Sequence, residues 1–249
     1  MQDKNTKSAA EHLSISVVLP AHNEGKNLPI LLPEAVLVLN SLKLDYEIIV
    51  VDDGSTDNTK EVVEDFVKKE GRVRLISHPK NLGYGAALTT GFRASTRDLV
   101  FFMDSDRQFE IKDITKLLPY VRSFDIVAGF RTVRQDPWYR VMIGRTYNLM
   151  VITLFSVKLR DIDCAFKIYH REVLDKINFE TIGALVNTEI MLKAQIMGKS
   201  VKEVGVNHYP RVAGKQSGAN PKVIIKAFFE TILLWWRYMG PGKSQRSLK

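Results

Sequence analysis

Short apolar runs alternate with amphipathic segments along the first half of the chain. The apolar runs that we predict to be strands lie at 14–20, 46–51, 73–78, 98–103 and 125–130. Between them, the spacing of apolar residues predicts helices at 28–42, 56–71, 84–95 and about 111–121. Strands that are apolar throughout and alternate with amphipathic helices indicate parallel βαβ units. The pattern therefore predicts an α/β protein, with helices covering both faces of a mainly parallel central sheet.

Two longer apolar segments follow, at 138–157 and 222–239. As a helix, the first would be apolar nearly all round. The second would carry Lys222, Lys226 and Glu230 along one narrow polar stripe, with aromatic residues elsewhere. Such helices suit either the surface of a membrane or packing against the domain or another subunit.

These patterns divide the chain into four parts. We predict a disordered tail at 1–13, a large α/β domain at 14–220, a C-terminal amphipathic helix at 221–240 and a flexible tail at 241–249. The longest run without a charged residue has 12 residues. A helix that crosses a membrane needs about 20 apolar residues, so the sequence predicts none, and no signal peptide is visible.

The net charge of +8 is unevenly distributed. Residues 190–249 contain 11 Lys/Arg and 2 Asp/Glu, whereas the rest of the chain contains 25 and 26. A basic C-terminal quarter favours an anionic partner, such as a phosphate or a membrane surface, although it can also serve solubility alone. No nucleic-acid recognition motif is visible, so we predict no specific nucleic-acid binding. The single cysteine, Cys164, excludes an intrachain disulfide and suits a reducing compartment.

Polar clusters follow the predicted strands at the points where these strands end. They are AHNEG (21–25), DDGSTD (52–57), DSDRQ (104–108) and GFR (129–131). Ligands of parallel α/β sheets bind beyond the carboxyl ends of the strands, so these clusters predict a site at one edge. Asp53 can accept hydrogen bonds from a ribose hydroxyl or a base N–H, whereas Asp57 is better placed as a helix cap.

Asp104 and Asp106 directly follow the apolar run FFM and lie on one side of an extended segment. With the Gln108 carbonyl, they suit a hard divalent cation such as Mg²⁺ or Mn²⁺, which could bind a diphosphate. A solvated loop would also explain this pattern taken alone. The glycine-rich segment 81–91 lacks the spacing of a dinucleotide-binding motif, and we expect it to let a helix pack close to the sheet.

Taken together, VVLPAHNEGKNLP, IIVVDDGSTDNT, NLGYGAALTTGF and FFMDSDRQF resemble the GT-A glycosyltransferases of family 2. Among these, the chain is most similar to the polyprenyl-phosphate sugar transferases, the group of dolichol-phosphate mannose synthase, over about 15–235. GFR at 129–131 is similar to the G-S-R of that group, and RDIDCAFKIY (160–169) to its D-x-x-x-G-F-R. Ala165 and Lys167 replace Gly and Arg of that pattern, and Arg107 replaces a typical Leu.

The resemblance implies a GT-A fold, a Rossmann-like sandwich, and assigns roles to individual residues. Pro20, Ala21, Glu24 and Asp53 would hold the nucleotide. Asp104, Asp106 and Gln108 would hold the metal and the sugar diphosphate. The phosphate-binding cations would be Arg131, Arg145, Arg211 and Lys215. Arg145 interrupts an apolar stretch, and a buried arginine is rare unless it is paired.

We therefore predict a metal-dependent inverting hexosyltransferase that uses a nucleotide-sugar donor, UDP- or GDP-linked, and a polyprenyl-phosphate acceptor. A phosphate acceptor is already anionic and needs positive charge, whereas a hydroxyl acceptor would need a general base, for which Asp163 and Glu189 are candidates. Transfer to a hydroxyl in glycolipid or polysaccharide synthesis is one alternative, and a non-catalytic membrane-binding module is another. We expect a cytoplasmic protein, peripheral at the cytoplasmic face of a membrane and held there by its own helices or by a membrane-anchored partner.

Overall fold

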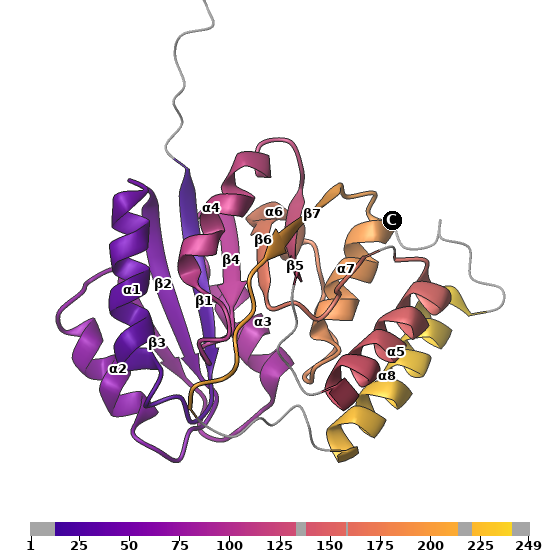
Figure 1. Cartoon of the computed structure of the whole chain (residues 1–249), viewed down its shortest axis with the longest axis horizontal. Helices are drawn as coiled ribbons and strands as arrows, with labels where there is room; N and C mark the ends of the chain where they lie inside the picture. Colours follow the sequence, from indigo (N-terminus) through magenta and orange to yellow (C-terminus); the bar gives the residue numbers. More distant parts are fainter. Residues whose placement is uncertain (1–12, 133–137, 158, 214–220, 241–249) are drawn as a thin grey trace, which may run out of the picture.

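The computed structural model describes residues 13–132, 138–157, 159–213 and 221–240 (Figure 1). The described part contains a seven-stranded sheet in the order β3-β2-β1-β4-β6-β5-β7. The strands are β1 (Ser14–Ala21), β2 (Asp45–Asp52), β3 (Val73–Ser77), β4 (Leu99–Met103), β5 (Ile126–Arg131), β6 (Phe166–His170) and β7 (Val201–Val206). β6 runs antiparallel to β4 and β5, and the other neighbouring pairs are parallel. The predicted mainly parallel sheet is confirmed.

The helices of the described part connect and flank these strands. They are α1 (Leu28–Ser41), α2 (Thr59–Val67), α3 (Tyr84–Ala94), α4 (Ile114–Leu117), α5 (Trp138–Phe155), α6 (Arg171–Asp175), α7 (Val186–Ile196) and α8 (Pro221–Met239). The prediction of one helix at 111–121 is wrong. α4 has only one turn and lies between short 3₁₀ segments at Ile111–Asp113 and Leu118–Tyr120. Pro119, which lacks an amide hydrogen and clashes with a preceding helical turn, accounts for the break.

The core is built on strands whose side chains are buried on both faces of the sheet. In β4 every residue is buried, and in β1 every residue after Ser14 is buried. α3 packs directly on β1 and β2. A Cβ added to Gly91 would lie 2.3 Å from Val18 Cγ1, so this glycine permits the close approach. The expectation that the glycine-rich segment lets a helix pack close to the sheet is confirmed here.

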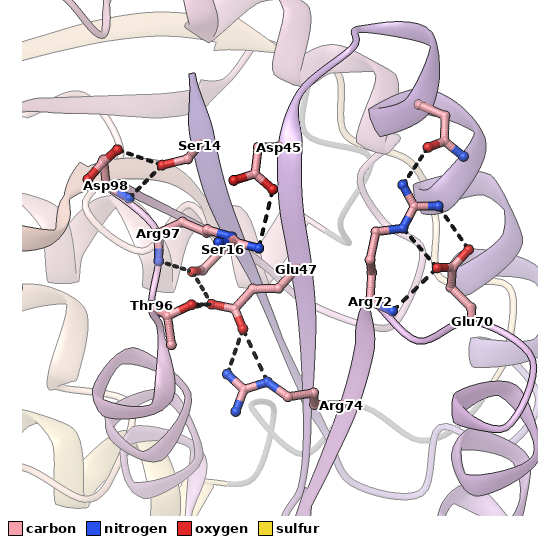
Figure 2. Close-up of polar contacts among 11 residues, drawn as sticks. Ser14, Ser16, Asp45, Glu47, Glu70, Arg72, Arg74, Thr96, Arg97 and Asp98 are labelled. Carbon is pink, nitrogen blue, oxygen red and sulfur yellow. Dashed lines mark hydrogen bonds and ion pairs between the residues drawn. The ribbon is translucent and has the colours of Figure 1, made fainter. Parts of the chain in front are cut away.

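A polar cluster around the buried Glu47 ties four chain segments together (Figure 2). The Glu47 carboxylate accepts hydrogen bonds from Ser16 Oγ at 2.7 Å, the Thr96 amide at 2.7 Å and Arg74 at 2.6 Å. Burial alone would raise the pKa of Glu47, but these hydrogen bonds lower it. The cluster therefore joins β1, β2, β3 and the turn before β4 through a fully partnered charge.

α5 and α8 lie side by side, together with α7, at one end of the molecule (Figure 1). The rings of Tyr147 in α5 and Phe228 in α8 meet edge to face, with centroids 5.8 Å apart. Both predicted helices are confirmed. The predicted polar stripe depends on the side chains of Lys222 and Lys226, which lie outside the described part. The tails at 1–12 and 241–249 lie outside it as well. Within the described ranges, no helix is long and apolar enough to span a bilayer.

Candidate active site

The ends of β1, β2 and β4 bring three of the polar clusters together. The Ser105 hydroxyl donates to the Pro20 carbonyl at 2.8 Å, and the Asp53 amide donates to the Ala21 carbonyl at 2.8 Å. β5, which ends at Arg131, runs in the same direction as β4 because both are antiparallel to β6. The clusters therefore meet at one edge of the sheet, as the sequence predicts.

Asp104 and Asp106 follow β4 at this edge. Asp106 is 8% exposed, and its Oδ1 accepts the Gln108 amide at 3.1 Å. Asp104 Oδ1 accepts the Tyr84 hydroxyl at 2.9 Å. Burial, followed by the negative charge of Asp106, raises the pKa of Asp104 to about 7. Two carboxylates that repel each other in a buried place provide a favourable position for a cation.

The carboxylates of Asp104 and Asp106 fit a divalent cation that takes its remaining ligands from a substrate. No group of three His, Cys, Asp or Glu side chains that could hold a metal occurs in the described ranges. Mg²⁺ and Mn²⁺ accept one or two carboxylates together with phosphate oxygens and water. Asp104 and Asp106 therefore fit such an ion when a diphosphate is bound beside them.

Arg211 connects the loop after β1 with the loop after β4. Its guanidinium donates to Glu24 Oε1 and lies 3.5 Å from Asp106 Oδ2, while its Nε donates to the Ala213 carbonyl at 2.7 Å. Burial raises the pKa of Glu24, and Arg211 partly opposes this effect. Of the four cations suggested by the resemblance, Arg211 lies directly against both acidic loops.

Arg131 lies beside Asp104 but is held by another acid. Its Nε and one terminal nitrogen each donate to Asp161 at 2.6 Å, which is a bidentate pair. Burial alone would lower the pKa of Arg131, but Asp161 raises it. The charge of Arg131 lowers the pKa of Asp104, and the charge of Asp163 raises the pKa of Arg131. Arg131 and Asp163 therefore belong to the same charged group as the metal-binding candidates.

Asp53 is already engaged by the protein. Its carboxylate accepts the amides of Leu82 and Gly83, each at 2.9 Å, and contacts His78 Nδ1 at 2.7 Å. In this arrangement Asp53 orders the segment that precedes α3. Asp57 accepts the Thr59 amide at 3.0 Å at the start of α2, which agrees with the predicted helix-capping role.

The remaining predicted residues fall in different places. Gln108 donates its side-chain amide to the Tyr209 carbonyl at 3.1 Å, which ties the loop after β4 to the segment that carries Arg211. Arg145 is exposed on α5, on the side of the helix that faces away from the packed core, and its contact with a phosphate stays a prediction. Lys215 lies outside the described residues.

Glu189, a candidate base for a hydroxyl acceptor, is 0% exposed and accepts the amides of Glu180 and Thr181 and the Lys193 ammonium. These contacts are structural and leave Asp163 as the candidate base.

Sequence reasoning missed Tyr84 and the functions of Asp161 and Lys167. Lys167 is fully buried and donates to the carbonyls of Ile162 and Cys164, so it holds the loop that carries Asp161. The signals were present, because Asp161 and Lys167 lie within the RDIDCAFKIY segment and Tyr84 stands between two glycines at a helix start. Burial and the charge of Asp104 keep the pKa of Tyr84 well above its ordinary range, so its hydroxyl remains a donor at neutral pH.

The fold is that of the GT-A glycosyltransferases. Mannosyl-3-phosphoglycerate synthase from Rubrobacter xylanophilus superposes with a TM-score of 0.72 at 18% identity, covering 95% of this chain and 80% of that one. Glucosyl-3-phosphoglycerate synthase from Mycobacterium tuberculosis, solved with Mn²⁺, UDP and glucosyl-3-phosphoglycerate, superposes with a TM-score of 0.69 at 20% identity, covering 90% and 80%.

The sequence pattern of glycosyl transferase family 2 matches residues 16–178, and the chain belongs to this family. Undecaprenyl-phosphate 4-deoxy-4-formamido-L-arabinose transferase from Aeromonas hydrophila is 31% identical over 204 residues, covering 81% of this chain. The protein of the same name from Pseudomonas fluorescens is 31% identical over 216 residues, covering 86%. The aligned region spans 61% and 62% of the length of these two relatives.

Proposed function

We propose that this chain transfers a sugar from a nucleotide sugar to a polyprenyl phosphate, with inversion at the anomeric carbon. The observation that carries the proposal is the pairing of two adjacent carboxylates, Asp104 and Asp106, with two arginines at the same sheet edge. Carboxylates of this kind suit a cation-bound diphosphate, and arginines suit a second phosphate. The named relatives, which are undecaprenyl-phosphate sugar transferases, support the acceptor class.

In this proposal the donor lies against the ends of β1 and β4. Glu24, Pro20 and Ala21 surround the nucleotide, with Asp53 ordering the neighbouring loop. Asp104 and Asp106 hold Mg²⁺ or Mn²⁺, with Gln108 beside them. The bound ion neutralises charge on the diphosphate and stabilises it as a leaving group. Arg211 must exchange its contacts with Glu24 and Asp106 for contacts with phosphate oxygens, which a planar guanidinium can bind in pairs.

The acceptor phosphate lies on the side of Arg131 in this proposal. An anionic phosphate oxygen attacks the anomeric carbon, the bond to the diphosphate breaks, and no proton has to be removed from the acceptor. Arg131 draws the acceptor phosphate toward the donor, while Asp161 fixes the direction of its guanidinium. Arg145 and Lys215 remain candidates for further phosphate contacts.

We place the chain at a membrane surface through α5 and α8. Large apolar side chains are exposed on both helices, including Trp138 at 75% and Leu233 at 67%. Exposed apolar patches mark interaction sites, and aromatic residues favour the water–lipid boundary. An acceptor with a polyprenyl chain requires such a location. The cytoplasmic face of the membrane is the location that we propose for this surface.

A panel of UDP- and GDP-linked sugars tests the proposal. Each is incubated with the purified chain, Mn²⁺ and undecaprenyl phosphate in detergent, and the lipid product is measured. At least one donor is expected to give a product whose formation stops with EDTA and falls by about 100-fold or more in Asp106→Asn, because the site then loses a metal ligand. Full activity in Asp106→Asn, or no effect of EDTA, would contradict metal-dependent catalysis, and no product with any donor would favour the non-catalytic alternative.

A further inference from the structure

The Tyr84 hydroxyl connects the metal-binding candidate Asp104 to a second layer of the fold. It donates to Asp104 Oδ1 at 2.9 Å. Asn187 of α7 is buried near the same hydroxyl. Rotation of the Asp104 carboxylate would break the hydrogen bond from Tyr84.

The backbone of Tyr84 is also fixed, by the segment 180–183. The amides of Gly85 and Ala86 donate to the Ile182 carbonyl at 3.0 and 3.3 Å. Gly83 has a φ of +107°, and a Cβ there would lie 2.5 Å from the Ile182 oxygen. A Cβ on Gly85 would lie 2.7 Å from the Gly183 oxygen. The glycines on either side of Tyr84 therefore allow a contact that any other residue would prevent.

α7 supports the segment that fixes the backbone of Tyr84. Glu189 in this helix accepts the amides of Glu180 and Thr181 at 2.8 and 2.9 Å. Because Glu189 is fully buried and paired with Lys193, the segment 180–183 has a firm attachment. The position of Tyr84 thus depends on the packing of α7.

We propose that Tyr84 is a positioning residue that holds the Asp104 carboxylate in the orientation required for a divalent cation. This inference rests on the proposed function, because it takes Asp104 as a metal ligand. Groups that hydrogen-bond a metal ligand fix its orientation, and their loss typically weakens metal affinity by about 10–100-fold. Tyr84 touches Asp104 and acts through it.

Binding of Mn²⁺ to the full chain, measured by electron paramagnetic resonance with saturating UDP and separately with GDP, tests this inference. Tyr84→Phe removes only the hydroxyl and is expected to weaken Mn²⁺ affinity about tenfold. The matched control is Tyr46→Phe, which removes a hydroxyl bonded to Asn40 away from the site, and it should bind like the wild type.

The sugar-transfer assay adds a second readout. In Tyr84→Phe the Mn²⁺ concentration for half-maximal rate should rise about tenfold. Saturating Mn²⁺ should restore most of kcat, whereas it would not restore the activity of a misfolded variant. Mn²⁺ affinity in Tyr84→Phe within twofold of the wild type, or an equal loss in Tyr46→Phe, would overturn the positioning role alone. Failure of the wild type to bind Mn²⁺ with either nucleotide would overturn the proposed function and this inference together.

Discussion

At the scale of single residues, the charges of the site neutralise one another within the protein. Arg211 lies between Glu24 and Asp106, and Arg131 is held by Asp161. A buried charge is costly when it is unpaired, so these pairs keep the site folded before substrates bind. In the proposed reaction, a nucleoside diphosphate with its metal ion would replace these protein partners, and the arginines released would become available to phosphate groups.

Asp163→Asn tests whether the transfer needs a general base. Loss of a general base typically costs about 10²–10⁴-fold in rate. Because a phosphate acceptor needs no base, we expect the variant to keep its rate of transfer to undecaprenyl phosphate within about tenfold, the remainder reflecting the changed charge beside Arg131. The rate is measured at saturating donor and acceptor. A loss of 100-fold or more would contradict a transfer that needs no base.

Glu47 makes stability depend on pH. Its pKa is lowered in the folded state, so its contribution is fully present above the ordinary value of about 4.3 and is lost as the pH falls through the folded value. Glu47→Gln should lower the free energy of unfolding at pH 7 by about 2 kcal/mol. It should also reduce the loss of this free energy as the pH falls, which is the acid limb of the stability curve. Urea unfolding from pH 7 to pH 3 measures both. An unchanged acid limb would contradict this account.

At the scale of secondary-structure elements, the five strands that the sequence predicts all form, whereas β6 and β7 were not predicted. The predicted strands are apolar throughout, which identifies buried parallel strands. β6 has only five residues and contains Lys167, whose complete burial depends on two carbonyls of the loop before it. β7 is an edge strand whose residues up to Gly205 are half-buried, so its pattern does not stand out.

The site divides in a similar way between what a sequence can and cannot predict. Asp104, Asp106 and Arg211 come together because strand ends and motif spacing set their positions. The partners of Arg131 and Tyr84 depend on tertiary packing, so no periodicity in the sequence reveals them. Arg145 is a case that the sequence leaves open: an arginine in an apolar stretch can be buried and paired or can lie at the surface, and the structure places it on the exposed face of α5.

The end of α8 is attached to the domain through Glu180. Its carboxylate accepts bonds from Arg237, Tyr238 and Lys193, and these bonds hold its pKa at about 2 despite partial burial. Glu180→Gln should raise amide hydrogen exchange in the last two turns of α8 by about tenfold, since it removes the charge from this junction. Exchange followed by mass spectrometry measures this, with α1 as the internal reference. Equal exchange in variant and wild type would show that apolar packing alone holds α8.

At the scale of the whole molecule, the site and the exposed apolar side chains of α5 and α8 belong to one domain. The sheet is continuous from β3 to β7, and α8 packs on α5 and bonds to Glu180. If the chain rests on lipid through these helices, as proposed, these attachments link the position of the site to that surface.

The double variant Leu233→Glu/Trp236→Glu tests the membrane surface. Each substitution replaces an exposed apolar side chain of α8 with a negatively charged one, so binding to vesicles that contain anionic lipid should fall by about tenfold or more. Flotation with liposomes measures the bound fraction. The control is Leu37→Glu, which changes a 71% exposed leucine on α1 and should bind like the wild type. Equal binding of the double variant and the wild type would exclude this part of α8 as the lipid-facing surface.

Ligand binding should stabilise the whole domain. A ligand at about 100 times its Kd adds about 2.7 kcal/mol to the free energy of unfolding, which corresponds to about 5–10 °C in Tm for a chain of this size. We expect Mn²⁺ together with the correct nucleoside diphosphate to produce a shift of this order, and each alone to produce less. Differential scanning fluorimetry measures Tm. A full shift with the nucleotide alone would contradict a site built around a shared metal ion.

The reversed direction of β6 has one further consequence. β6 is bonded to β4 on one side and to β5 on the other, with Met103 opposite Phe166 and Ala128 opposite Lys167. The spacing between the acids after β4 and the guanidinium at the end of β5 is thus tied to main-chain ladders on both sides of β6. In the proposed reaction the two anions would meet at a separation set by the sheet, so differences in donor and acceptor preference would arise in the loops around the site.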